Sequence, residues 1–558
     1  MDRYFGKEGI LSKKLKGFEY RPQQQDMAQA IRECLKAQKH IIVEAPTGVG
    51  KSIAYLIPLA EALTRAEVER AVVATYTKAL QRQLVEKDLP VVRENLFPDL
   101  KYTVSFGSEN YLCLRRLEAA REGGLFDDIH PGHFNALLRW ANETFTGLVM
   151  EAPVVDAGLW SLVCRDPDLC HHKDCPYYLQ CFYQKAKKQE RDSQLIVVNH
   201  HLYFVNMASG WSILPEFQVS VFDEAHEIEK VASEYLGYEV SSGSVKYLLD
   251  SILNRKGKGL LRRLRLPDNL FSRVQGILQR TRAQAETFFQ RVAELLGPER
   301  SIKLPYPVPV VDILSEHLDD LAEELKTLID LTEREDLKRD LRAMSTRCRA
   351  FVETLEMLLE QKLPDYVYWT ERHQRTVKLV ATPLEPAEQL RNHLYSLMDT
   401  VVLTSATLTV GGNFSFIKQR IGLDEAEELS LPSPFNYREN LLLYIPQGIP
   451  EPDTEGYKEA ITEEIEKLVR LSDGRTLVLF TSYALMQEVL HKINLQGYEL
   501  LIQGQRDSYR LVEEFRTNPR TVLCGVYTFW QGIDVPGDAL QCVIITRLPF
   551  SVPTDPVV

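Results

Sequence analysis

Residues 39–63, KHIIVEAPTGVGKSIAYLIPLAEAL, decide the fold of this chain. The short apolar run 41–45 predicts a buried strand, and the residues from Lys51 onward predict an apolar helix. Between them, PTGVG can continue neither a strand nor a helix. A strand, a glycine-rich turn and a helix start together form a cradle whose backbone N–H groups face phosphate oxygens. The residues of this predicted nucleotide site are Thr47, Gly48, Val49, Gly50, Lys51 and Ser52.

Lys51 and Ser52 have different roles in the predicted site. The Lys51 ammonium would contact the β- and γ-phosphates, and the Ser52 hydroxyl would ligate Mg²⁺. The strict form of the motif begins with Gly, whereas this chain has Ala45 at that position. From the roles of Lys51 and Ser52 we expect ATP and Mg²⁺ as cofactors.

A second motif, VFDEAH, ends another apolar run at residues 219–226. Asp223 can hold Mg²⁺ through water, and Glu224 can orient and deprotonate the attacking water. His226 belongs to the same string, and we assign it with Lys51, Asp223 and Glu224 to the catalytic set. Downstream of a P-loop, at the carboxyl end of an apolar strand, this string strongly indicates nucleotide hydrolysis.

Length and composition indicate a large globular protein. The chain has 558 residues, of which 44% are hydrophobic and 26% charged, so three or four domains with ordinary cores are expected. No apolar run approaches the roughly 20 residues of a membrane span, and the N-terminus lacks the apolar core of a signal peptide. We expect a cytoplasmic protein with no membrane partner. Because the net charge is −12, a nucleic acid would have to bind in a local basic groove.

Five of the nine cysteines lie between residues 113 and 181. Cys170, Cys175 and Cys181 form a C-x4-C-x5-C group, and Cys113 and Cys164 precede it. An odd number of cysteines in a large unsecreted chain favours metal or cluster ligation over disulfides. Zinc suits four thiolates, but the C-x2-C spacing common in its sites is absent. All-cysteine ligation with irregular spacing fits an iron–sulfur cluster at least as well, and the residues leave open which four of the five bind.

The remaining sequence contains an α/β half, a helical stretch and a second α/β half. Residues 236–377 carry apolar side chains at steps of three and four, which predicts an inserted domain built on an antiparallel helix pair. Two α/β units suit a P-loop motor, in which ATP at a shared cleft moves one unit against the other. Further strands are expected within residues 71–74, 193–199, 376–384, 399–405, 475–483, 521–526 and 541–550.

Taken in order, seven motifs resemble those of the XPD/DinG family of superfamily 2 DNA helicases, particularly the bacterial DinG branch. The motifs are RPQQQDM, APTGVGKS, ATYTKALQ, VFDEAH, LTSATL, LFTSY and FWQGIDVPG. The resemblance, which runs from about residue 5 to the last residue, implies an α/β fold with two P-loop (RecA-like) motor domains and parallel sheets. The first motor domain would carry an inserted iron–sulfur domain and an inserted helical arch domain. The expected boundaries are 1–107, 193–235 and 378–408 for motor domain 1, 108–192 for the iron–sulfur domain, 236–377 for the arch and 409–558 for motor domain 2.

The same likeness implies roles for individual residues. It makes the cluster a 4Fe-4S cluster held by Cys113, Cys170, Cys175 and Cys181, which leaves Cys164 as a bystander. It also implies that Gln24 contacts adenine and that Gly532 and Asp534 lie in a loop near nucleotide and DNA. The positions that match family contacts with the DNA backbone are Thr77, Gln81, Thr481 and Ser482.

The resemblance implies an ATP-dependent DNA helicase that moves along single strands with 5′-to-3′ polarity. Its partner would be single-stranded or forked DNA, which a monomer would unwind in repair or replication. Two other classes stay open on the residues alone. One is a zinc-stabilised nucleic-acid-binding ATPase that remodels without unwinding, and the other is a P-loop switch that acts on protein partners.

The end of the sequence adds one expectation. The family supplies an arginine finger from a Q-x-x-G-R-x-x-R helix, which follows the segment matched here by RLPFSVPTDPVV. Because this chain stops at Val558, we expect a C-terminally truncated sequence whose second domain lacks that helix. Arg547, on the closing strand, is a poor substitute. Apolar surface near residues 543–545 should then be exposed.

Overall fold

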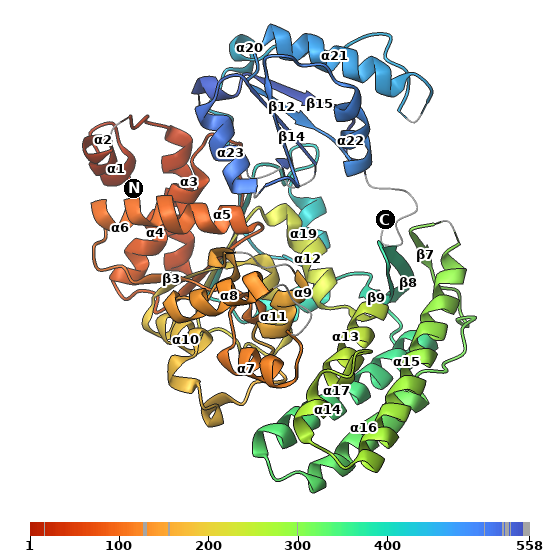
Figure 1. The fold of residues 1–558 in the computed structure, drawn as a ribbon. Helices are drawn as coiled ribbons and strands as arrows, with labels where there is room; N and C mark the ends of the chain where they lie inside the picture. The colour runs from red at the N-terminus through yellow and green to blue at the C-terminus, as the bar shows by residue number, and fades with distance from the viewer. Residues whose placement is uncertain are drawn as a thin grey trace. The chain divides into compact units, whose positions relative to one another are not determined.

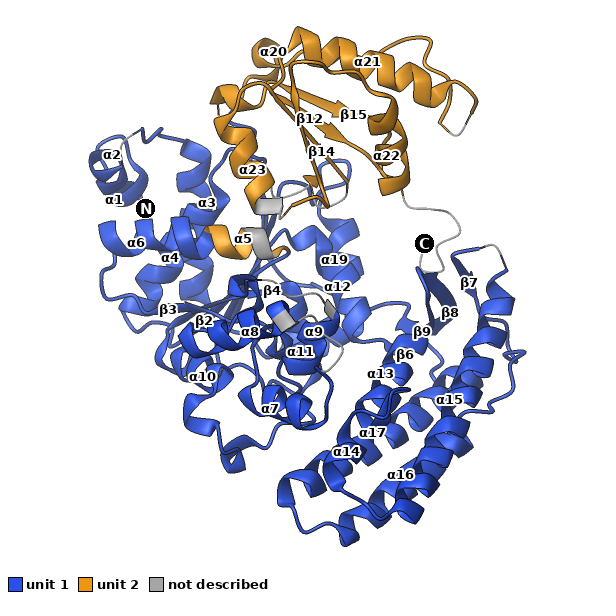
Figure 2. Ribbon diagram, in the orientation of Figure 1, with its two compact units in different colours: residues 1–76, 84–434, 554–558 blue, residues 77–83, 435–553 orange. Residues whose placement is uncertain are grey.

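The computed structural model describes residues 1–15, 17–126, 131–153, 157–297, 299–452, 454–506, 508–526, 529–530, 535 and 537–550. The chain divides into two compact units, coloured separately in Figure 2. Unit 1 contains Met1–Tyr76 and Leu84–Pro434, and unit 2 contains Thr77–Gln83 and Phe435–Pro553.

The centre of unit 1 is a seven-stranded sheet in the order β11-β1-β10-β5-β2-β4-β3 (Figure 1). Each neighbouring pair in this sheet is parallel. Parallel neighbours need crossover connections, so the predicted α/β architecture is confirmed here. The strands are β1 (Ile41–Glu44), β2 (Ala71–Thr75), β3 (Tyr102–Val104), β4 (Leu195–Asn199), β5 (Val219–Asp223), β10 (Thr400–Ser405) and β11 (Glu427–Ser430).

Both faces of this sheet are covered by helices. Ile41 and Val43 of β1 belong to one apolar cluster and Ile42 to another, because successive side chains of a strand point to opposite faces. The first cluster includes side chains of α3 and α4, and the second includes side chains of α11 and α12. Burial on both faces explains why the strands are almost continuously apolar. The helices that accompany the sheet are α1 (Asp2–Phe5), α2 (Ile10–Lys14), α3 (Pro22–Ala37), α4 (Lys51–Thr64), α6 (Leu89–Asn95), α11 (His200–Ala208), α12 (Ile228–Tyr235), α18 (Ala387–Leu390) and α19 (Ser415–Ile421).

The first motor domain continues past the expected boundary at residue 408. Strand β11 pairs in parallel with β1, with Glu427 opposite Ile41, so it belongs to the first sheet. The two units divide between Pro434 and Phe435. The difference arises because β11 is a short edge strand with two glutamates, which gives no apolar run to predict it.

The cysteine domain, residues 108–192, has its own apolar core. Tyr111, Leu137, Val163 and Phe182 are buried together in one cluster. The described residues of this domain include four helices, with 3₁₀ turns between α8 and α9 and between α9 and α10. The helices are α7 (Leu114–Glu122), α8 (Pro131–Glu143), α9 (Ala157–Val163) and α10 (Phe182–Asp192).

The helical domain, residues 238–383, combines the predicted helices with a sheet that the sequence did not predict. Helices α16 and α17 form the expected pair, and their leucines Leu321 and Leu341 are fully buried in one cluster. Four antiparallel strands in the order β6-β9-β8-β7 close the domain. Residues 378–383, expected to start the last part of motor domain 1, belong instead to β9 and pair with β8 in this sheet. The elements are β6 (Tyr238–Ser241), α13 (Ser242–Leu253), α14 (Leu260–Leu264), α15 (Asp268–Leu296), β7 (Ser301–Lys303), α16 (Ser315–Leu331), α17 (Glu335–Glu360), β8 (Tyr366–His373) and β9 (Thr376–Pro383).

Unit 2 is a second parallel α/β unit, with strand order β13-β14-β12-β15. Val543 and Ile545 on the edge strand β15 are 53% and 49% exposed, which agrees with the expected apolar surface there. Within the described ranges, no helix of either unit is both long and apolar enough to cross a membrane. The elements are α5 (Lys78–Gln83), α20 (Tyr437–Asn440), α21 (Tyr457–Leu471), β12 (Thr476–Leu479), α22 (Tyr483–Lys492), β13 (Glu499–Ile502), α23 (Ser508–Thr517), β14 (Thr521–Gly525) and β15 (Cys542–Ile545).

Candidate active site

The predicted P-loop lies at the carboxyl end of β1 and leads directly into α4. Gly48 and Gly50 have φ angles of 86° and 84°, in the left-handed region that favours glycine. Gly50 is the N-cap of α4, so the helix begins at Lys51 with its first N–H groups directed at the loop. The backbone therefore has the form that a phosphate cradle requires.

Two side chains from the start of α3 hold the P-loop. Gln24 Nε2 donates to the Gly50 carbonyl at 3.0 Å, and an Arg21 guanidinium N–H donates to the Gly48 carbonyl. A Cβ atom on Gly50 would lie 2.2 Å from Gln24 Nε2, so a side chain there would displace the Gln24 amide, and the positive φ also favours glycine. Adenine contact by Gln24 stays a prediction. The sequence did not predict this role for Arg21, although it belongs to the same RPQQQDM motif as Gln24.

Glu224 of the DEAH string lies close to the P-loop lysine, Lys51. Lys51 Nζ lies 3.6 Å from Glu224 Oε1. Glu224 has a φ of 58°, a left-handed conformation that side-chain-bearing residues seldom adopt and that is found at active sites. This conformation follows β5 immediately and turns the carboxylate toward the loop that carries Lys51.

Ser405 and His226 complete the surroundings of Glu224. The Ser405 hydroxyl donates to Glu224 Oε2 at 3.2 Å, and its oxygen lies 2.7 Å from His226 Nδ1. His226 Nδ1 is also 3.4 Å from Glu224 Oε2. Ser405, at the end of β10, and His226, in the turn after β5, therefore hold one oxygen of the carboxylate, and the other oxygen faces Lys51.

Asp223 and Ser52 are the predicted Mg²⁺ ligands, and Tyr55 holds the first of them. The Tyr55 hydroxyl donates to Asp223 Oδ2 at 3.1 Å. Burial raises the pKa of Asp223, and the Lys51 ammonium acts in the opposite direction. A buried carboxylate of this kind gains from a divalent cation, so these residues fit Mg²⁺ and would hold it against the β- and γ-phosphates.

Glu44, the last residue of β1, is a site residue that the sequence did not reveal. Its carboxylate accepts the backbone N–H groups of Leu408 and Thr409 at 2.6 Å each and the Thr409 hydroxyl at 2.9 Å. Burial alone would raise the pKa of Glu44, but these donors lower it below its ordinary value. The residue thereby joins the strand before the P-loop to the segment after Ser405.

The four predicted cluster cysteines lie close enough to influence one another. Burial raises the pKa of Cys175 and of Cys181, and the nearby thiols of Cys113 and Cys170 raise each pKa further, because thiolates repel. Cys113 and Cys181 are the N-caps of α7 and α10, positions that favour a thiolate. A cationic cluster would offset the repulsion between thiolates at such positions, which is the chemistry that the predicted ligands would need.

Cys164 differs from these four. Burial raises its pKa, and the charges that act on the thiol next are those of Arg116 and Asp166. Arg116 donates to the Cys164 carbonyl and lies 3.7 Å from its sulfur. Among the residues that the structure describes, no group of three or more His, Cys, Asp or Glu side chains has the arrangement needed to hold a single metal ion. The cluster therefore stays a prediction.

The residues predicted to contact DNA lie at the starts of helices. The Thr77 hydroxyl accepts the Leu80 N–H at 3.2 Å, and Gln81 is buried. In unit 2, Ser482 is the N-cap of α22, where its hydroxyl accepts the Leu485 N–H at 3.2 Å. Thr481 precedes it and is exposed. Gly532 and Asp534 lie outside the described residues.

Comparison with known proteins extends these observations. A family model for DEAD/DEAH box helicases matches residues 21–111, and one for a helicase C-terminal domain matches residues 465–558. The Escherichia coli ATP-dependent DNA helicase YoaA is 32% identical to this chain over 99% of the chain and 86% of its own length. The chain belongs to the XPD/DinG family of superfamily 2 helicases.

Other members of this family support the same assignment. The Mycobacterium tuberculosis ATP-dependent helicase DinG is 30% identical over 96% of the chain and 82% of its own length. A solved structure named XPD helicase shares the fold with a TM-score of 0.56 at 16% identity, over 96% of this chain and 87% of that one. As a member of the XPD/DinG family, the protein is an ATP-hydrolysing helicase enzyme, and Lys51, Asp223 and Glu224 occupy the places where that chemistry is expected.

Proposed function

We propose that the protein is an ATP-dependent DNA helicase that translocates along single-stranded DNA from 5′ to 3′ and unwinds forked duplexes in repair or replication. The observation that carries this proposal is the contact between Lys51 and Glu224, at 3.6 Å, with Glu224 held in a left-handed conformation. Such a pair couples a phosphate-binding cation to a base for the attacking water. The names of the YoaA and DinG relatives support DNA as the substrate.

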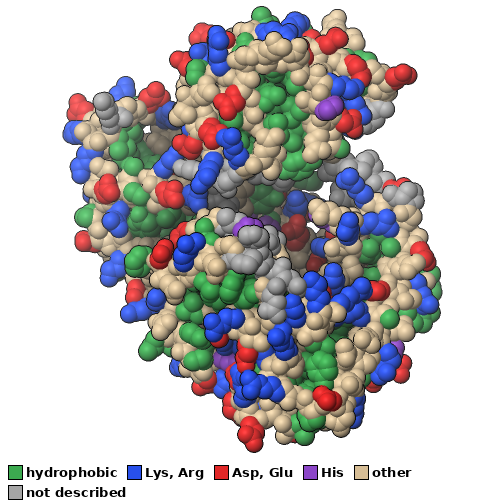
Figure 3. Space-filling model, in the orientation of Figure 1, with side chains coloured by type: hydrophobic (Ala, Val, Ile, Leu, Met, Phe, Trp, Pro, Cys, Tyr) green, Lys and Arg blue, Asp and Glu red, His purple; other side chains and the backbone are tan. Residues whose placement is uncertain are grey.

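The surface charge also supports a local DNA path. Although the net charge is −12, Figure 3 shows Lys and Arg side chains gathered in the region of α7, α9 and α13 on the visible face of unit 1. Lys and Arg side chains grouped in this way can bind the phosphates of a DNA strand whatever its base sequence. We include Thr77, Gln81, Thr481 and Ser482 as backbone contacts, and we propose a cytoplasmic monomer as the acting form.

We further propose that Cys113, Cys170, Cys175 and Cys181 hold a 4Fe-4S cluster. The mutual effect of these thiols on the pKa of Cys175 and Cys181 supports this ligand set over one that includes Cys164. Bound there, the cluster would crosslink α7, the 170–181 loop and α10. We expect this role to be structural, because all four thiols belong to the small cysteine domain.

A strand-displacement assay tests the proposed function. Partial duplexes with only a 5′ tail or only a 3′ tail are supplied with ATP and Mg²⁺, and release of the labelled strand is followed. The proposal predicts release from the 5′-tailed duplex and none from the 3′-tailed one. Release from the 3′-tailed duplex alone would overturn the polarity. If ATP is hydrolysed and neither duplex opens, the protein remodels DNA complexes without unwinding, and the helicase proposal is wrong.

A further inference from the structure

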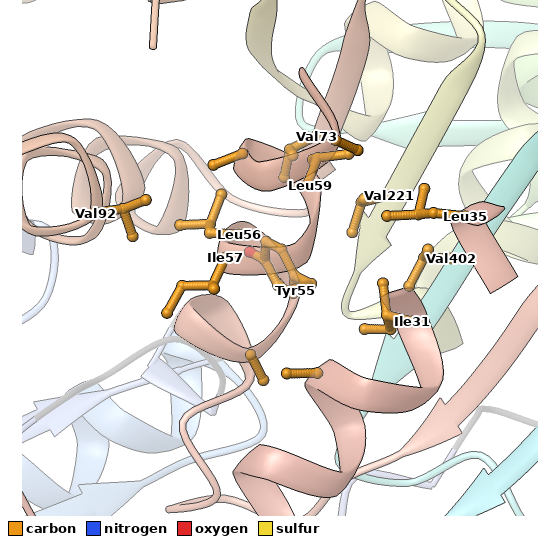
Figure 4. Packing of buried hydrophobic residues seen from close by; sticks show 14 of the residues in the cluster. Ile31, Leu35, Tyr55, Leu56, Ile57, Leu59, Val73, Val92, Val221 and Val402 are labelled. Carbon is orange, nitrogen blue, oxygen red and sulfur yellow. The ribbon is translucent and has the colours of Figure 1, made fainter. Parts of the chain in front are cut away.

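Tyr55 lies on α4 one turn beyond Lys51 and three residues beyond Ser52, so the three side chains share one side of the helix. Its ring is fully buried. Figure 4 shows Tyr55 within the apolar cluster that also contains Leu56, Ile57 and Val221. In an apolar helix of this kind a tyrosine would be expected only to fill space, yet its hydroxyl donates to Asp223, a predicted Mg²⁺ ligand.

The Asp223 carboxylate is fixed at both oxygens. Tyr55 donates to Oδ2 at 3.1 Å, and the Glu224 backbone N–H donates to Oδ1 at 3.1 Å. The Asp223 carbonyl is held as well, since His200 Nε2 lies 2.9 Å from it. A carboxylate has about four lone-pair sites, so these bonds orient the group and leave lone pairs for a cation or its water.

A buried tyrosine hydroxyl needs a partner in any protein, so burial alone does not assign a role. Tyr203, on helix α11, provides the comparison. It is also fully buried, and its hydroxyl lies 2.6 Å from the hydroxyl oxygen of Ser220. Ser220 lies on β5 but is not part of the predicted metal site. Tyr55 differs because its partner, Asp223, is a predicted Mg²⁺ ligand.

We propose that Tyr55 is a positioning residue for the divalent cation that accompanies the nucleotide: its hydroxyl sets the orientation of Asp223, and thereby the affinity of the site for Mg²⁺. The inference rests on the proposed function, since it assumes that this site binds an Mg²⁺–nucleoside triphosphate. Residues that orient metal ligands in this way commonly change metal affinity by 10–100-fold when they are removed.

The test compares Tyr55→Phe with Tyr203→Phe, because each substitution removes one buried hydroxyl from the same domain. Binding of a non-hydrolysable ATP analogue is measured by calorimetry in EDTA and at increasing Mg²⁺, without DNA. For Tyr55→Phe we expect the Mg²⁺ concentration for half-maximal effect to rise by about 10–100-fold, with affinity in EDTA unchanged. Tyr203→Phe should need the same Mg²⁺ as the unsubstituted protein. Equal Mg²⁺ requirements for all three proteins would overturn the inference.

A double substitution separates positioning from a loss of packing. In an Asp223→Asn background, Tyr55→Phe should have little further effect on the Mg²⁺ requirement, because the carboxylate that it orients is absent. A full additional effect there would show that Tyr55 acts through packing, and the inference would be wrong. Failure of the proposed function looks different: the unsubstituted protein would bind the analogue normally and yet release no strand from a tailed duplex.

Discussion

Asp340 of the helical domain and Arg115 of the cysteine domain form a buried ion pair, with 3.0 Å between Asp340 Oδ1 and Arg115 Nη1. The same carboxylate lies 2.8 Å from Arg263 Nη1 and 3.2 Å from His171 Nε2. Arg115 directly follows the α7 N-cap region that contains Cys113, and His171 follows Cys170. One carboxylate of α17 therefore holds two segments that carry predicted cluster ligands, in the part of unit 1 where α7 and α14 lie close together (Figure 1).

Substitution of Asp340 should destabilise unit 1. In Asp340→Asn, the Arg115 guanidinium, whose side chain is 8% exposed, loses its carboxylate partner, whereas Arg263 keeps Glu122 and Asp336. Leaving a buried charge without its partner costs about 3–5 kcal/mol. The free energy of the first urea-unfolding transition should fall by this amount. The control is Asp174→Asn, which removes the carboxylate that pairs with Arg339. Because this ion pair is exposed, its loss should cost at most about 1 kcal/mol. Equal losses for both variants would contradict the account.

The contribution of Asp340 should depend on pH in one direction. Burial alone would raise the pKa of Asp340, but His171, Arg115 and Arg263 lower it to about 2. Because the folded pKa lies below the unfolded value of about 3.9, the stabilisation is present above that value and is lost as the pH falls toward 2. The difference in unfolding free energy between the unsubstituted protein and Asp340→Asn should therefore decrease as the pH falls from 4 toward 2. If this difference in unfolding free energy increased as the pH fell from 4 toward 2, the account would be contradicted.

Glu44 gives a prediction about the link between the P-loop strand and the segment after Ser405. Glu44→Gln keeps the shape of the side chain but replaces one acceptor oxygen by an NH₂ group that faces N–H donors. Hydrogen bonds to charged groups contribute about 1.5–3 kcal/mol, so the variant should be less stable by about that amount in urea unfolding. Glu428→Gln on β11 changes an exposed carboxylate that pairs with Lys418 and should change stability by less than about 1 kcal/mol. If the Glu44→Gln variant is as stable as this control, the hydrogen bonds to the Glu44 carboxylate do not stabilise the protein as predicted.

The cysteines give a prediction that can be tested by absorbance and metal analysis. Protein purified without oxygen should be brown and contain about four irons per chain if the cluster is cubane. Serine at Cys113, Cys170, Cys175 or Cys181 should bleach it, because each change removes one ligand. Cys164→Ser is the matched control and should keep the colour. A colourless protein with one zinc ion per chain would show that the site holds zinc.

Particular residues show how far sequence reasoning reached. The P-loop and the DEAH string were located correctly, since each follows an apolar strand buried on both faces, and Gly48 and Gly50 have the left-handed φ that their residue type suggests. The sheet of the helical domain was missed because β7 is three residues long and β8 mixes Trp369 with Glu371, Arg372 and His373, which breaks the alternation of a strand. Tyr55 and Glu44 were missed because their partners, Asp223 and Leu408, are far away in the sequence. Only the folded chain brings these groups together.

The most direct test of the central claim is ATP hydrolysis by this protein with and without single-stranded homopolymer DNA, with homopolymer RNA in parallel. The account predicts that DNA increases the rate. It also predicts that Glu224→Gln lowers the DNA-stimulated rate by about 10²–10⁴-fold while the protein still binds ATP. Glu234→Gln, an exposed acid on the nearby helix α12, serves as the control and should hydrolyse ATP normally. A rate that DNA does not change, or a Glu224→Gln variant that hydrolyses ATP as fast as the control, would contradict the account.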